Sequence, residues 1–125
     1  MTSTAETRPP ARSGTAETLH GLVLERARRH PGRTAVSLGD ERWSYGELDR
    51  RSAALARRLR DLGVGPDRRV AIVAGRSFET IAGVLAVLRA GGAYVPLDPD
   101  YPAERLEFMG RDSGATVVLV EERRL

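Results

Sequence analysis

Residues 88–106, Leu-Arg-Ala-Gly-Gly-Ala-Tyr-Val-Pro-Leu-Asp-Pro-Asp-Tyr-Pro-Ala-Glu-Arg-Leu, carry the densest set of local structural signals in the chain. Gly91 and Gly92 follow an apolar helical pattern, at the place of a left-handed C-terminal cap. The next residues are expected to be extended, because Pro96 lacks an N–H and restricts the residue before it. A stiff turn follows, and Pro102 suits the first turn of a new helix. The stretch therefore predicts a helix end, a short strand and a second helix.

The rest of the chain extends this pattern in both directions. From residue 69 onward strands and helices alternate, which favours βαβ units and a parallel sheet. We expect an α/β fold, with a mixed, largely parallel sheet and flanking helices, over residues 17–125, behind a polar leader at 1–16 that is expected to be disordered. The expected elements are a helix capped by Thr18, strand 34–38, a hairpin return at 42–44, a helix after Ser44, strand 69–74, a helix after Ser77, a helix at about 102–113 and strand 116–120.

Three of these elements carry detailed expectations. Ser44 and Glu47 form a capping-box pattern, in which Glu47 would reach back to the N–H of Ser44. The strand at 69–74 is mostly apolar, which predicts burial on both faces. The buried stripes of the two long helices are expected to be Leu48, Leu55, Leu59 and Leu62, with Ser52 and Ala56 beside them, and Phe78, Ile81, Val84, Leu85 and Leu88.

Composition limits the class of protein. The chain has 125 residues, 41% hydrophobic and 30% charged, which fits one globular domain. No apolar run is long enough to span a membrane and no signal-peptide core is present, so we expect a cytoplasmic protein without a membrane partner. The absence of cysteine excludes disulfides and thiolate metal sites. All 20 basic residues are arginine, so no step that needs a lysine side chain is carried by this chain alone.

Two turns contain residue types that occur in binding sites. The turn at 75–77, Gly-Arg-Ser, lies between a strand and a helix N-terminus, where an anion can bind; an ordinary βα turn with a serine cap is the favoured interpretation. Asp98 and Asp100 resemble paired carboxylates, but their flanking prolines favour turn residues.

Other side chains predict surface or packing roles. His20 and His30, ten residues apart, do not have the spacing of a metal-ligand pair. The tyrosines are expected to pack at helix starts and strand edges. Arginines crowd two helices, yet 17 acidic residues are interleaved and the formal net charge is only +3, which favours solvated faces over nucleic-acid binding. These residues are Tyr45, Tyr94 and Tyr101, and Arg26, Arg28, Arg29, Arg33, Arg50, Arg51, Arg57, Arg58 and Arg60.

Two motifs carry a family resemblance. Residues 43–48, Trp-Ser-Tyr-Gly-Glu-Leu, resemble the first core motif of adenylation domains, L-[TS]-Y-x-E-L, with Trp43 in place of leucine. Residues 88–98 resemble the second, L-K-A-G-x-A-Y-[VL]-P-[LI]-D, with Arg89 in place of lysine. The resemblance extends from about residue 19 to residue 120.

The resemblance implies an AMP-forming acyl-adenylate enzyme, closest to the amino-acid-activating domains of nonribosomal peptide synthetases. Such enzymes use ATP and Mg²⁺ to form an aminoacyl-adenylate and load a phosphopantetheine thiol on a peptidyl carrier domain. The family's phosphate loop, nucleotide motifs, amino-acid pocket and catalytic lysine all lie after this stretch. Residues 17–125 are therefore expected to be the N-terminal segment of a truncated adenylation domain, with no catalytic, cofactor-binding or metal-binding residue and no activity alone.

The implied partners are the remainder of the adenylation domain, the carrier domain and an amino-acid substrate. Three alternatives stay open at this point: a non-catalytic α/β interaction module, an acyl-CoA ligase-type member of the same family, and a basic nucleic-acid binder.

Overall fold

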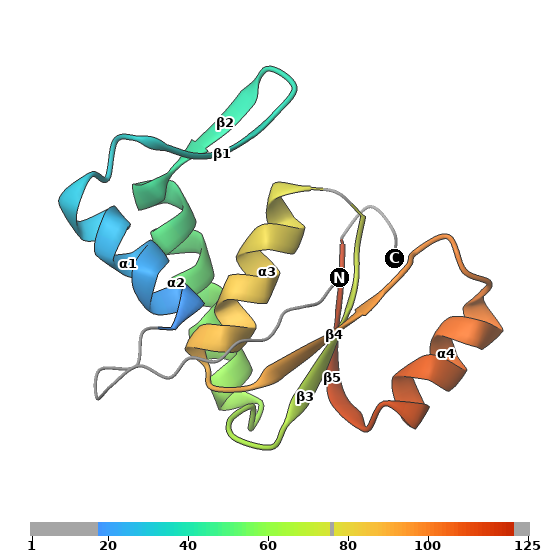
Figure 1. The fold of residues 1–125 in the computed structure, drawn as a ribbon. Coiled ribbons are helices and arrows are strands. Elements are labelled where there is room, and N and C mark those ends of the chain that lie inside the picture. Colours follow the sequence, from blue (N-terminus) through green and yellow to red (C-terminus); the bar gives the residue numbers. More distant parts are fainter. Residues whose placement is uncertain (1–17, 76, 122–125) are drawn as a thin grey trace.

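The computed structural model describes residues 18–75 and 77–121, so the expected leader at 1–16 lies outside the described residues. Helices and strands follow one another in the order that the sequence predicts (Figure 1). The elements are α1 (Leu19–Arg29), β1 (Thr34–Leu38), β2 (Glu41–Ser44), α2 (Tyr45–Asp61), β3 (Arg69–Val73), α3 (Phe78–Arg89), β4 (Ala93–Leu97), α4 (Ala103–Asp112) and β5 (Ala115–Val120).

The strands form two sheets. β3 lies at the centre of a parallel three-stranded sheet of order β4-β3-β5, and Val73 aligns with Leu97 on one side and with Val120 on the other. β1 and β2 form a separate antiparallel hairpin, in which Gly39 has a φ of +61°. The expected mixed, largely parallel α/β architecture is confirmed, with its antiparallel strands in a sheet of their own.

Helices cover both faces of the parallel sheet. Val70 and Ile72 of β3 pack in a cluster with residues of α2 and α3. Ala71 and Val73 face the opposite way and pack with Leu97 and with side chains of α4. These four residues of β3 are 0–9% exposed, which confirms the prediction that the strand is buried on both faces.

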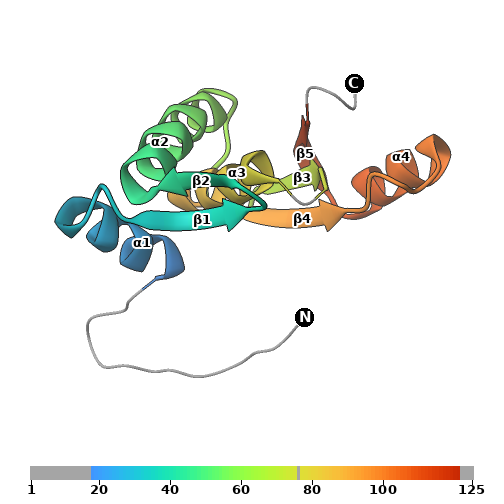
Figure 2. The same cartoon turned by 90° about the horizontal axis from the view of Figure 1, so that it is seen from above.

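α1 and the hairpin complete one side of the molecule. Leu48 of α2 and Leu85 of α3 form a second buried cluster, against which Val23 of α1 and Trp43 of β2 pack. Figure 2 shows α1 and α4 at opposite ends of the molecule, with α2, α3 and the sheet between them.

Glycines end α2 and α3 in the same way. At the end of α2, Gly63 has a φ of +93° and the next N–H, from Val64, donates to the carbonyl of Leu59. At the end of α3, Gly91 has a φ of +89° and the N–H of Gly92 donates to the carbonyl of Val87 in the same relation. Both ends are Schellman motifs, which need a residue that adopts positive φ at low cost.

Some sequence expectations are wrong in detail. Glu47 does not reach back to Ser44: its carboxylate binds Arg50 and Arg51 instead, while Ser44 lies in β2 opposite Thr34. Leu62 is 64% exposed: it is the C-cap that follows the end of α2 at Asp61, and it does not continue the buried stripe.

The buried face of α3 also differs from the expected stripe. Phe78 and Leu85 are buried as expected, whereas Ile81, Val84 and Leu88 are only partly buried. Ala82, Ala86 and Val87 are buried instead, because the helix lies between the sheet and α2.

Candidate functional site

The connection from β3 to α3 lies at the carboxyl edge of the parallel sheet, where α/β proteins commonly bind ligands. Here the Gly75 N–H donates to the Glu121 Oε1 atom at 3.2 Å. Ser77 caps α3 by accepting from the Thr80 N–H at 3.2 Å, and the Thr80 hydroxyl donates to the Gly75 carbonyl at 2.5 Å. These groups bond to one another within the turn, and Arg76 lies outside the described residues.

This geometry tests whether the turn at residues 75–77 is an anion site. A phosphate at a helix N-terminus uses backbone N–H groups that point at it. In this turn a carboxylate already accepts from Gly75, and the Ser77 hydroxyl accepts from the first turn of the helix. The structure therefore supports the interpretation of an ordinary βα turn, closed by a carboxylate from the neighbouring strand.

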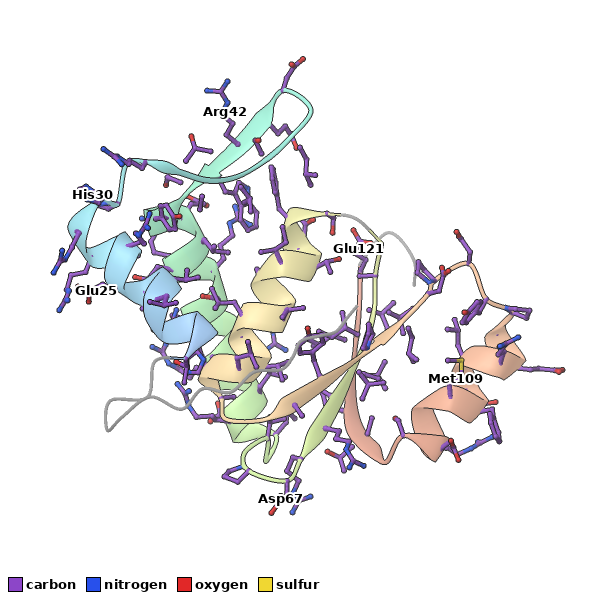
Figure 3. The ribbon with its side chains drawn as sticks, in the orientation of Figure 1. Glu25, His30, Arg42, Asp67, Met109 and Glu121 are labelled. Carbon is purple, nitrogen blue, oxygen red and sulfur yellow. The ribbon has the colours of Figure 1, made fainter. Side chains whose placement is uncertain are left out.

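Glu121 is the residue that sequence reasoning missed. It follows β5 directly, is 8% exposed, and extends the pairing with β3 through its N–H, which donates to the Val73 carbonyl at 3.4 Å. Figure 3 labels it at the carboxyl end of β5, beside the start of α3. Its position immediately after an apolar strand was the available signal, because residues at strand ends in parallel sheets meet at one edge.

Asp98 and Asp100 are turn residues, as the flanking prolines predicted. The Asp98 side chain accepts from the Asp100 N–H at 2.9 Å, and the Asp98 carbonyl accepts from the Tyr101 N–H at 3.1 Å. Asp98 and Asp100 are both exposed. The arrangement is an Asx turn that stiffens the connection from β4 to α4.

The two histidines occupy different environments on α1. His20 is half-buried, and His30 is the exposed C-cap, whose N–H donates to the Arg26 carbonyl. Across residues 18–75 and 77–121, no group of three or more histidine, aspartate or glutamate side chains is arranged to hold a metal ion. Over the same ranges, no helix has the length and apolar character needed to cross a bilayer.

Four of the nine clustered arginines have acidic partners on their own helix. Glu25 pairs with Arg28 and Arg29 on α1. On α2, Glu47 pairs with Arg50 at 2.6 Å and with Arg51 at 2.8 Å, and these hydrogen bonds hold the pKa of the Glu47 carboxyl below its ordinary value of 4.5. The pairing supports the interpretation of solvated helix faces.

Arg89 is different, because it joins two helices. Its Nη1 atom lies 2.8 Å from the Asp49 Oδ1 atom, 3.0 Å from the Asp49 carbonyl and 2.8 Å from the Ser52 hydroxyl. Arg60 in turn donates to the Arg89 carbonyl at 3.3 Å. Ser52 is fully buried and the Arg89 side chain is 19% exposed, so this contact lies at the covered junction of α2 and α3.

The first motif also contributes an aromatic contact. Trp43 stacks on Phe78 with ring centroids 4.9 Å apart, and the Arg51 guanidinium lies 4.6 Å from the Trp43 ring. The larger ring in place of the family's leucine therefore connects the hairpin to the start of α3. Tyr94 and Tyr101 are more exposed than expected of packing residues, although Arg105 covers one face of the Tyr101 ring at 4.7 Å.

The comparisons with known proteins agree with this fold. The family described as "AMP-binding enzyme" matches residues 23–125, and the chain belongs to that family. Its relatives include surfactin synthase subunit 1 of Bacillus subtilis (strain 168), 47% identical over 108 residues, which are 86% of this chain and 3% of that protein. The AMB antimetabolite synthetase AmbB of Pseudomonas aeruginosa is 52% identical over 103 residues, or 82% of this chain and 8% of that protein.

Solved structures agree with this family assignment. The crystal structure of the nonribosomal peptide synthetase FmoA3 in its AMPPNP-bound form superimposes with a TM-score of 0.84 at 34% identity. The match covers 90% of this chain and 12% of the FmoA3 chain. The chain thus corresponds to part of a nonribosomal peptide synthetase adenylation domain and spans a small share of the proteins it matches.

Neither of the two turns that the sequence suggests as sites has free groups arranged for ATP and Mg²⁺ among its described residues. The turn at the carboxyl edge is closed by Glu121, and the two aspartates after β4 are committed to an exposed turn. The two family motifs, residues 43–48 and 88–98, lie where helices begin and end. The first begins α2, and the second ends α3 and leads into β4.

Proposed function

We propose that residues 17–125 form the N-terminal segment of an amino-acid-activating adenylation domain of nonribosomal peptide biosynthesis. In the complete enzyme, ATP and Mg²⁺ would serve to form an aminoacyl-adenylate, and a phosphopantetheine thiol on a carrier domain would accept the acyl group. The family match over residues 23–125, together with the similarity to synthetase subunits, carries this proposal.

The role proposed for this segment is structural. Its two motifs join α2 to α3 and α3 to β4, and the arginine of the second motif binds next to the end of the first. A segment of this kind holds the sheet on which later parts of the domain are built. The chain alone is expected to have no adenylation activity.

Two measurements test the proposal. The isolated chain should show no amino-acid-dependent ATP–pyrophosphate exchange; substantial exchange would contradict the assignment of the chemistry to other segments. The chain should also replace the matching 108 residues of surfactin synthase subunit 1 and retain exchange in the chimera. A recipient that lacks the segment entirely is the control and should be inactive.

The chimera also separates the proposed role from an independent interaction module. If this chain is part of an adenylation domain, the graft should restore exchange above the level of the recipient without the segment. A well-folded chimera with no exchange, beside an active parent, would favour the non-catalytic module instead.

A further inference from the structure

We draw no further inference here: the strongest candidate, the apolar hollow of about 250 Å³ that is lined by Val23 of α1, Leu48 of α2 and Ile81, Val84 and Leu88 of α3, carries nothing, because nothing among residues 18–75 and 77–121 shows what covers it.

Discussion

Replacement of Arg89 tests how the two motifs stabilise each other. One Arg89 nitrogen, Nη1, meets three oxygen atoms: the Asp49 carboxylate at 2.8 Å, the Asp49 carbonyl at 3.0 Å and the Ser52 hydroxyl at 2.8 Å. Because all three acceptors converge on a single nitrogen, an ammonium group with three donors can satisfy the same set. We therefore expect Arg89→Lys to be tolerated and Arg89→Met to be destabilising.

The magnitude follows from the exposure of the partners. A hydrogen bond to a charged donor contributes about 1.5–3 kcal/mol, and a partly exposed ion pair contributes less. Ser52 is fully buried, whereas the Asp49 side chain is 42% exposed and recovers water when Arg89 is lost. The expected loss is about 2 kcal/mol of unfolding free energy for Arg89→Met and under about 1 kcal/mol for Arg89→Lys.

Equilibrium urea unfolding followed by circular dichroism measures both variants. A double-mutant cycle with Ser52→Ala should show coupling to Arg89, since the two side chains are in contact. Equal destabilisation by lysine and methionine would refute the single-nitrogen argument. A methionine variant as stable as the parent would show that the contact contributes nothing.

Three further predictions concern single positions. Gly92→Ala places a Cβ atom 2.7 Å from a buried valine methyl and 3.1 Å from a backbone carbonyl, so urea unfolding should show a loss of about 2 kcal/mol in unfolding free energy. Gly65→Ala is the control, because nothing lies within 4 Å of its Cβ position, and equal effects of the two substitutions would contradict the packing argument. The lowered pKa of Glu47 means that its ion pairs stabilise the fold above pH 4.5 and stop doing so as pH falls through the lowered pKa. The difference in unfolding free energy between the parent and Glu47→Gln should therefore vanish in acid, and a difference that does not change with pH would contradict the assignment. Glu121→Ala should speed amide exchange at Gly75, while Glu121→Gln, which keeps a side-chain oxygen, should change it less; identical exchange in both would show that the oxygen is not the acceptor.

Most of the fold could be predicted from local chemistry. The caps at Thr18, Ser44 and Ser77 are confirmed by side-chain hydrogen bonds to the first turns of their helices. The glycine end of α3 is confirmed by a positive φ angle at Gly91, and Gly63 ends α2 in the same way. Such features depend on a few neighbouring residues, so a single sequence contains the information needed to place them.

What could not be predicted depends on contacts between distant segments. Glu47 fits a capping box by spacing, but two arginines at the next turn compete for its carboxylate. Glu121 follows a strand and begins a charged stretch, and only the parallel alignment of β3 with β5 brings it to Gly75, 46 positions earlier. The stripe expected for α3 omitted Ala82, Ala86 and Val87, because the helix packs against both the sheet and α2.

The same contacts explain why two short motifs identify the family so well. The first motif ends at Leu48, and the next residue, Asp49, accepts two hydrogen bonds from Arg89 of the second motif, 40 positions later. The two motifs are thus held together at the junction of α2 and α3. A lysine, which the family motif has at this position, offers the same donors to the same oxygen atoms. The motifs therefore specify a joint between helices, and a resemblance carried by that joint identifies the enzyme family without marking any residue that would touch a substrate.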